Sequence, residues 1–355
     1  MMKVTLWRQD AEILRPVRAA AQHHDARSRL FVRVEYAGSA GYGEVAPQRE
    51  ALNGDAGLTD VVDEVRVFVV PQLQNILERE GDLPSWTRVA RFAGSRAASN
   101  PAVALLEMAL LDRELRVARS SIDDLWPAIY DTPLQTTVSL IDDGDWRVDD
   151  AVARVRAKVS AAPITASALR RLGELTVPVL LDYNCTAGGD LEVIEQVRVV
   201  RGVAEVAAVE QPYAVGNVVD TARLAERLDV AVSVDEGVRS LRDVAQLVRY
   251  HAAEIICVKP ARVGGLANAR TIVAEARAAG LRPYVGGFFE SPYARAVHTA
   301  LARSCVDQPS DLSPVAVVGD GDSREVDPVA DGFGVTPSAE MLARGAVLVD
   351  VEVTT

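Results

Sequence analysis

Three carboxylates close short apolar runs in the middle of the chain. Asp182, Glu210 and Asp235 are spaced by 28 and 25 residues, which is the period of a repeated strand–helix unit. The runs before them do not alternate polar with apolar residues, so they predict strands buried on both faces of a parallel sheet. In a barrel of such units the strand ends meet at one mouth. Three carboxylates there would repel each other unless a hard cation neutralised them, which predicts Mg²⁺, with Mn²⁺ as the alternative.

Two lysines flank this set. The 38 basic residues include three lysines, and two of them, Lys158 and Lys259, fall on the strand before and the strand after the carboxylates. A group that must lose its proton near neutral pH cannot be arginine, so lysine at these points indicates acid–base chemistry. A metal that holds a substrate carboxylate, with a lysine on either side, suits removal of the adjacent α-proton. Arg156 lies on the same strand face as Lys158, where its charge favours the neutral form of that lysine.

Composition narrows the class of protein. A chain of 355 residues is long enough for one large or two medium domains with an extensive core. It has no apolar run near the ~18–20 residues of a membrane span, and residues 1–10 lack the apolar core of an export signal. The net charge of −12 argues against general binding of nucleic acid. Cys185, Cys257 and Cys305 have no metal-type spacing, so we expect free thiols and a cytoplasmic location.

The first 125 residues differ in pattern from the rest. Val4–Leu6 and Leu30–Tyr36 alternate as half-exposed strands, and Gly41–Val45 continues the sheet. Helical spacing follows over Thr59–Arg79, and Asn100 with Pro101 is typical of a cap and first turn that open a long apolar helix. This predicts an α+β domain at residues 1–125.

Strand and helix alternate from Thr132 onward. Seven strands and their helices predict a closed barrel at residues 126–315, with an irregular eighth strand near Val306–Leu312. Residues 316–355 are expected to return to the first domain, because Gly345–Val353 again alternates like a strand. The expected strands are 134–140, 153–160, 179–182, 207–210, 232–235, 255–258 and 282–287, and the expected helices are 166–175, 191–202, 218–228, 241–251, 266–279 and 293–303.

These residues carry a resemblance to a known family. The barrel motifs are Arg156-Ala157-Lys158, Asp182-Tyr183-Asn184, Glu210-Gln211-Pro212, Asp235-Glu236-Gly237 and Lys259 to Gly265. Together they resemble the enolase superfamily, in its muconate-lactonizing subgroup. The segment Gly286 to Ser291 is similar to one of o-succinylbenzoate synthases and N-succinylamino-acid racemases, and Gly41-Tyr42-Gly43-Glu44 resembles the Gly-Trp-Gly-Glu of the family's capping domain.

The resemblance implies a modified (β/α)7β TIM-type barrel, with an α+β capping domain formed by the N-terminal segment and the C-terminal tail. The substrate would be a small carboxylate held between the two. Mg²⁺ ligands would be Asp182, Glu210 and Asp235. In a synthase Lys158 removes the proton while Lys259 stays protonated, and in a racemase the two lysines exchange a proton on opposite faces. Residues expected to bind substrate or support the site are Arg156, Asn184, Glu236, Glu290 and Ser291.

Some positions depart from the family pattern. Arg156 stands where the first lysine of a Lys-x-Lys motif is expected, which keeps its field and alters its geometry. Phe288 and Phe289 are bulkier than the family's usual residues and indicate either core packing or a pocket narrowed toward an apolar substrate. His23 and His24 lie in a segment, Arg15–Arg27, that we expect to be a loop facing the substrate.

Three functional hypotheses follow. The leading one is an o-succinylbenzoate synthase, a carbon–oxygen lyase that dehydrates a cyclohexadiene carboxylate in menaquinone biosynthesis. The second is an N-acylamino-acid racemase or a muconate-type cycloisomerase. The third is a barrel without turnover that serves as a binding subunit, and retention of Lys158 and Lys259 in a chain almost free of lysine weighs against it. A homo-oligomer is left open.

Overall fold

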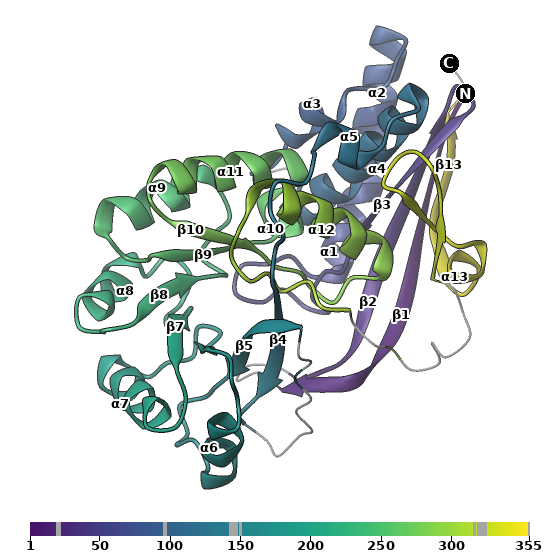
Figure 1. The fold of residues 1–355 in the computed structure, drawn as a ribbon. Helices are drawn as coiled ribbons and strands as arrows, with labels where there is room; N and C mark the ends of the chain where they lie inside the picture. The colour runs from purple at the N-terminus through teal and green to yellow at the C-terminus, as the bar shows by residue number, and fades with distance from the viewer. Residues whose placement is uncertain are drawn as a thin grey trace.

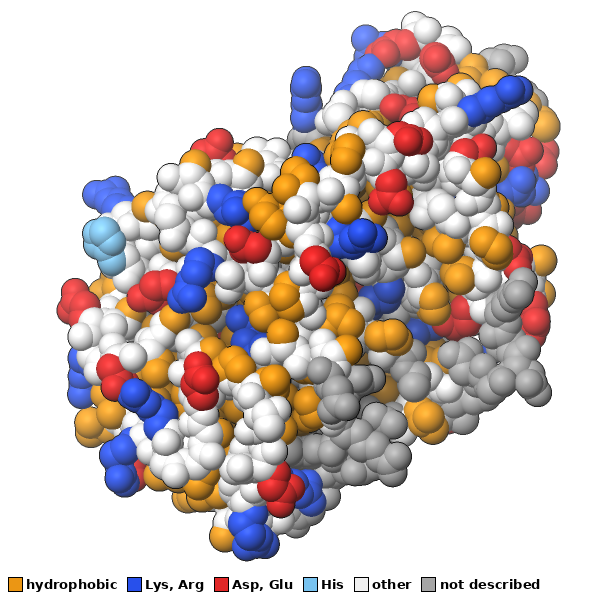
Figure 2. Space-filling model, viewed as in Figure 1, with side chains coloured by type: hydrophobic (Ala, Val, Ile, Leu, Met, Phe, Trp, Pro, Cys, Tyr) orange, Lys and Arg blue, Asp and Glu red, His pale blue; other side chains and the backbone are white. Residues whose placement is uncertain are grey.

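The fold consists of a β/α barrel packed against an antiparallel sheet, with both chain ends beside that sheet (Figure 1). It is a computed structural model and describes residues 1–18, 23–94, 98–141, 148, 151–314, 317 and 325–353. Within those residues, no helix has both the length and the apolar character needed to cross a bilayer. On the face shown in Figure 2, acidic and basic side chains are interspersed.

The capping sheet has four antiparallel strands in the order β13-β1-β2-β3. Val4, Leu6, Val32 and Val34 are buried, so the period-2 pattern does place one face of the sheet against the core. The predicted return of the C-terminus is confirmed, because β13 pairs with β1 from Met2↔Val353 onward. The strands are β1 (Met2–Arg18), β2 (His23–Tyr36), β3 (Ser39–Val45) and β13 (Ala346–Val353).

The expected loop at Arg15–Arg27 is wrong where the structure describes it. β1 and β2 pair as far as Arg18↔His23, after an irregularity that follows Glu12↔Ala26. The polar residues of this stretch indicated a loop, but ladder hydrogen bonds hold the backbone whatever the side chains are. Residues 19–22 lie outside the described residues.

Helix α4 (Asn100–Ala118) lies between the capping sheet and the barrel (Figure 1). Ser99, in an extended conformation, is its N-cap, and Asn100 is its first helical residue, so the cap was predicted one residue too late. The helix is buried on almost all sides, which is why its sequence is apolar without a polar stripe. The other helices of this part are α1 (Leu58–Glu64), a π-helical turn (Val65–Val69), α2 (Val70–Glu80), α3 (Trp86–Ala90) and α5 (Ile122–Leu125).

The barrel sheet has seven parallel strands in chain order from β4 to β10, with helices on its outside (Figure 1). The predicted strands and helices are confirmed within a few residues at their ends. The strands are β4 (Leu134–Ser139), β5 (Val152–Lys158), β6 (Val179–Asp182), β7 (Val206–Glu210), β8 (Ala231–Val234), β9 (Ile255–Val258) and β10 (Arg282–Val285). The helices are α6 (Ala166–Gly173), α7 (Asp190–Arg201), α8 (Val218–Ala225), α9 (Leu241–Tyr250), α10 (Pro260–Val263), α11 (Leu266–Ala278) and α12 (Pro292–Cys305).

An irregular segment bridges the first and last strands. Ser310 bonds to β4, where its carbonyl accepts from the Gln135 N–H at 2.9 Å, and the Asp311 N–H donates to Val285 of β10 at 3.0 Å. The prediction of an irregular eighth strand near 306–312 is therefore confirmed in position. Inside the ring, a separate apolar cluster of Leu180, Ala208, Ile255, Cys257 and Tyr284 fills the barrel. Beyond α12 lie β11 (Val326–Pro328), β12 (Val335–Pro337) and α13 (Ala339–Ala343).

Two glutamates of the capping domain cap helices of the barrel. Glu44 accepts from the Ser291 N–H at 2.7 Å and from the Ala294 N–H at 3.1 Å, at the start of α12. Glu107 accepts from the Leu266 and Ala267 N–H groups at 3.0 and 2.8 Å, at the start of α11. These bonds satisfy donors that a helix start leaves without partners.

The glycine before Glu44 has a steric reason. A Cβ added at Gly43 would lie 2.0 Å from the Leu105 carbonyl oxygen of α4, so only glycine lets β3 approach that helix. The Gly-Tyr-Gly-Glu motif thus combines close packing on α4 with a carboxylate that reaches the barrel.

Candidate active site

The strand register places the predicted catalytic and metal-binding side chains in one row, called here the carboxylate row. Lys158 pairs with Asp182, Asp182 with Glu210, and Glu210 with Ser233, each on the adjacent parallel strand. Asp235 follows two residues after Ser233 and so shares its face. The predicted convergence of the three carboxylates at the C-terminal ends of the strands is what the structure shows.

The three carboxylates meet around a single nitrogen of Arg156. Its Nη2 lies 2.6 Å from Asp182 Oδ2, 2.5 Å from Glu210 Oε1 and 2.8 Å from Asp235 Oδ2. Arg156 comes from β5, two residues before Lys158, and is 3% exposed. Burial by itself would lower the pKa of Arg156, but the charges of Asp182 and Glu210 outweigh it and hold the pKa well above the ordinary value.

The donor set suits a metal, although a side chain fills its centre. Among the described residues, no group of three or more acidic, histidine or cysteine side chains is arranged to hold a metal ion as it stands. An Nη2 carries two hydrogens and faces three carboxylates, and Glu210 Oε1 is left buried without a hydrogen bond. This surplus of oxygen acceptors is the chemistry that Mg²⁺ satisfies. Asp182, Glu210 and Asp235 therefore fit the ion if the guanidinium moves away.

The two lysines lie at opposite ends of the carboxylate row. Lys158 Nζ donates to Asp182 Oδ2 at 2.5 Å, and Lys259 Nζ donates to Asp235 Oδ2 at 2.9 Å. The ammonium of Lys259 also lies 4.6 Å from the centre of the Phe288 ring, a cation–π contact. Burial lowers the pKa of Lys259, but Asp235 more than compensates, so the pKa is raised and the lysine is held charged.

Each carboxylate has its own electrostatic environment. Burial raises the pKa of Asp235, but Arg262 and Lys259 outweigh it and hold the pKa well below the ordinary value. The pKa of Asp182 is also lowered, because the charges of Arg156 and Lys158 outweigh the effect of burial. The pKa of Glu210 is raised, mainly by burial. The row is thus neutralised unevenly, with Glu210 the least compensated member.

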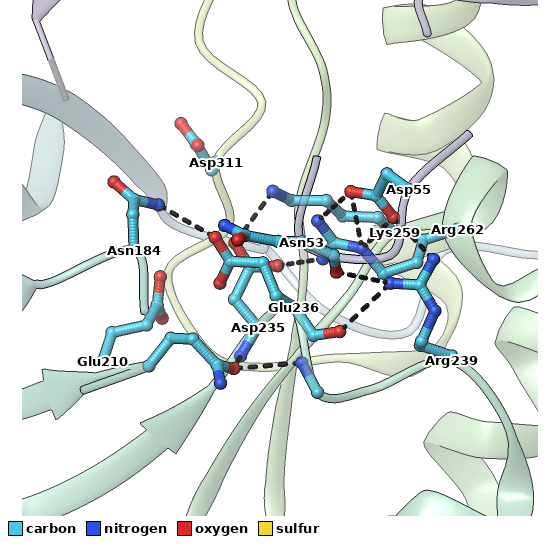
Figure 3. A network of polar contacts seen from close by, with 12 residues as sticks. Asn53, Asp55, Asn184, Glu210, Asp235, Glu236, Arg239, Lys259, Arg262 and Asp311 are labelled. Atoms are coloured by element: carbon cyan, nitrogen blue, oxygen red, sulfur yellow. Dashed lines mark hydrogen bonds and ion pairs between the residues drawn. The ribbon is translucent and has the colours of Figure 1, made fainter. Parts of the chain in front are cut away.

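A second layer of charge comes from the capping domain (Figure 3). Asp55, in the loop after β3, accepts from Arg262 Nη2 at 2.8 Å and lies 3.0 Å from Arg239 Nη2. Arg262 Nη1 in turn donates to Asp235 Oδ1. Sequence reasoning missed Asp55 and Arg239 and quoted Arg262 only within a motif. The position of Arg262 after Lys259 was a signal, whereas Asp55 follows Asn53 and Gly54 and is typical of a turn.

Asn184 and Glu236 lie beside the row and bond to each other, and their supporting role stays a prediction. Asn184 Nδ2 donates to Glu236 Oε1 at 3.0 Å. Asn184 Oδ1 and Glu236 Oε2 are both buried without a hydrogen-bond partner. Burial, with Asp235 and Asp182 nearby, raises the pKa of Glu236 to about 7.

The backbone is strained next to two of the carboxylates. Asn184 has φ 45° and Gln211, directly after Glu210, has φ 39°. Left-handed conformations in residues other than glycine cost roughly 1–3 kcal/mol and cluster at functional sites.

Glu290 and Ser291, the predicted residues of the Gly286 to Ser291 segment, bond to residues outside the carboxylate row. Ser291 Oγ donates to Glu44 Oε2 at 2.5 Å and is fully buried. Glu290 Oε2 lies 3.4 Å from Arg295 Nη2 and accepts from the Phe288 N–H at 2.8 Å. Their substrate roles stay predictions.

Phe288 and Phe289 make different contacts. Phe288 is 9% exposed and packs with the core of the capping domain while facing Lys259. The Phe289 ring centre lies 5.2 Å from that of His24 on β2, and Phe289 has φ 67°. The side chain of His23 lies outside the described residues.

Gly286 is required by the packing of Lys259. A Cβ at this position would lie 2.5 Å from Cys257 Sγ and 3.0 Å from Lys259 Cε. The predicted free thiols are confirmed for Cys185, Cys257 and Cys305.

Comparisons with known proteins find a matching family and relatives that are similar over most of the chain. The family described as "Enolase C-terminal domain-like" matches residues 143–339, more than half of the chain. The N-succinylamino acid racemase of Amycolatopsis sp. is 26% identical over 96% of this chain and 95% of its own length. The o-succinylbenzoate synthase of Bacillus subtilis (strain 168) is 24% identical over 84% and 81%.

Solved structures share the fold. An enolase-superfamily member from Listeria innocua Clip11262 superposes with a TM-score of 0.81 at 19% identity, covering 99% of this chain and 98% of that one. The 2-chloromuconate cycloisomerase of Rhodococcus opacus 1CP gives 0.78 at 21% identity, covering 97% and 98%. With the barrel, the capping sheet and the matched family, this chain belongs to the enolase superfamily, in its muconate-lactonizing subgroup.

Proposed function

We propose that this chain removes the α-proton of a small carboxylate substrate and dehydrates it, as an o-succinylbenzoate synthase of menaquinone biosynthesis. The observation that carries the proposal is the placement of Lys158 and Lys259 at opposite ends of one carboxylate row. A substrate carbon held over that row would have a lysine on each face. Lyase, racemase and cycloisomerase chemistry all begin with such an arrangement, and the choice among them rests on the substrate.

Asp182, Glu210 and Asp235 would hold the divalent cation. When bound, the cation supplies positive charge that stabilises the enediolate formed as the α-proton leaves. Lys158 takes this proton onto Nζ as the C–H bond breaks. In a syn elimination the departing hydroxyl lies on the same face, so Lys158 returns the proton to it as the C–O bond breaks, and water leaves.

Lys259 acts as the fixed cation on the other face. Its bond to Asp235 and its contact with the Phe288 ring both favour the ammonium over the amine. A permanently charged group near the developing enediolate lowers the barrier without exchanging a proton. Asp182, Glu210 and Asp235 are at most 1% exposed, and this exclusion from bulk water strengthens these interactions.

A racemase acting on N-acylamino acids is the second candidate. Asn184 Oδ1 and Glu236 Oε2 are buried acceptors without a donor, and an amide N–H in the substrate would satisfy one of them. One relative, similar over 96% of this chain, is an N-succinylamino acid racemase. Cycloisomerization and a binding subunit without turnover remain the further alternatives.

One pair of assays separates these reactions. Purified protein with MgCl2 is given the cyclohexadiene carboxylate, and the fall in its ultraviolet absorbance is followed. In parallel, N-succinylamino acids are incubated in D2O and α-deuterium is measured by mass spectrometry. Dehydration at the higher kcat/KM is the expected result. Exchange without dehydration would replace the leading proposal with the racemase. No reaction in either assay would contradict both the synthase and the racemase.

A further inference from the structure

We infer that Arg156 is an internal cation that competes with the divalent metal for the three carboxylates, and that metal binding requires its guanidinium to turn onto Asp311. The inference rests on the proposed function for the presence of the metal. This chain has arginine at a position where lysine was expected, and the guanidinium must make room for that ion.

The contacts of Arg156 place its charge at the centre of the row. Nη2 is within 2.8 Å of an oxygen from each of Asp182, Glu210 and Asp235. An arginine Nη lies one covalent bond further from Cα than a lysine Nζ, so lysine at this position would stop short of that point. Reach by itself does not explain the contact, because Arg154, on the same strand face, instead bonds the Pro309 carbonyl oxygen at 2.8 Å and Gln135.

Basic side chains already neutralise the carboxylates of the row. Four of them face the four carboxylates named below, and Arg156 Nη2 lies within 2.8 Å of an oxygen from each of Asp182, Glu210 and Asp235. An ion held by the same three oxygens would have to lie where Nη2 is, so the two cannot share the centre of the row. Either the ion or Nη2 occupies the centre. The carboxylates are Asp182, Glu210, Asp235 and Glu236, and the basic residues are Arg156, Lys158, Lys259 and Arg262.

Asp311 offers the guanidinium a second place. Arg156 Nη1 already lies 3.2 Å from Asp311 Oδ2, on the irregular segment that closes the barrel. Asp311 has a side chain 18% exposed and is the most accessible of the four acidic partners of Arg156. Arg156 Nε has no hydrogen-bond partner, so the inner part of the side chain is not fixed by one. A turn toward Asp311 would keep one ion pair and release Nη2 from the row.

The test is the affinity for MgCl2 measured by isothermal titration calorimetry in the absence of substrate. Arg156→Lys moves the competing charge away from the centre of the row and Arg156→Met removes it, and we expect each to bind Mg²⁺ at least about tenfold more tightly than the wild type. Arg154→Lys is the matched control, since it makes the same change two residues away on the same face, and its affinity should stay within about twofold. A thermal unfolding series in EDTA and in MgCl2 gives a second readout: the Arg156 variants should lose stability in EDTA and regain it with Mg²⁺.

Asp311→Asn tests the second place without altering Arg156. It should weaken Mg²⁺ binding about tenfold in the wild type and leave it unchanged in Arg156→Met, because the guanidinium that needs Asp311 is then absent. Unchanged affinity in Arg156→Lys and Arg156→Met would overturn the competition, and equal effects of Asp311→Asn in both backgrounds would overturn the movement. If wild type and all variants bind no Mg²⁺ or Mn²⁺, the metal-assisted function itself fails. If only the Arg156 variants bind, the competition stands while metal assistance in the wild type fails.

Discussion

Replacement of Asp55 by asparagine tests the link between capping domain and barrel. Asp55 accepts from Arg262 Nε at 3.0 Å and Nη2 at 2.8 Å, and both side chains are almost fully buried, at 7% and 2% exposure. Asparagine keeps the shape but turns one oxygen into an NH2 group that faces the guanidinium. Breaking a buried ion pair at one partner costs roughly 3–5 kcal/mol. Arg262 retains Asp235, so we expect the free energy of unfolding to fall by about 2–4 kcal/mol.

Urea denaturation at neutral pH measures this loss, with the slope m compared to confirm that the unfolding transition is unchanged. Asp63→Asn is the control, because Asp63 forms an exposed pair with Arg66 at 3.8 Å and should cost less than about 0.5 kcal/mol. Burial raises the pKa of Asp55, but Arg262 outweighs it, so the folded pKa lies below the unfolded one. This stabilisation is present above the unfolded pKa and is lost as pH falls through the folded pKa. A loss below about 1 kcal/mol in Asp55→Asn would refute the buried link.

Three further substitutions test the site and its supports. Burial raises the pKa of Glu107 from 4.5 to about 8, so wild-type stability should fall as pH rises through that window, by at most about 5 kcal/mol. Glu107→Gln should remove this pH dependence of stability, measured by thermal unfolding at a series of pH values. Stability curves of wild type and variant that run parallel across this pH range would contradict it. Gly286→Ala should push Lys259 aside and lower kcat at least about tenfold, whereas Gly189→Ala, which meets no atom within 4 Å, should not. Ser291→Ala should cost about 1–2 kcal/mol of stability with KM unchanged; a tenfold rise in KM would instead support its substrate role.

The barrel and its carboxylates were predictable because they follow from short-range rules. Buried parallel strands are apolar throughout, and a charged residue at the end of one must face the mouth of the barrel. Asp182, Glu210 and Asp235 needed no knowledge of long-range contacts beyond the repeat spacing. The scarcity of lysine then singled out Lys158 without any information on its position in space.

The parts that sequence reasoning missed depend on contacts between distant segments. Asp55 and Arg262 are 207 residues apart, and a turn sequence around Asp55 gives no sign of the pair. Glu107 was hidden in an apolar helix, although a single acid within the apolar residues 102–111 was a signal of a buried partner. The centre of the row was missed because the reach of Arg156 depends on its rotamer, which the spacing of residues does not determine.

The role of Lys158 as the base is tested most directly by comparing wild type with Lys158→Arg. Arginine keeps the charge beside Asp182 but cannot act as a base. With saturating MgCl2, the rate of substrate consumption by the variant should fall at least about a thousandfold, while calorimetry finds its Mg²⁺ affinity near that of the wild type. Turnover by Lys158→Arg within tenfold of the wild type would contradict proton abstraction by Lys158 and the function built on it.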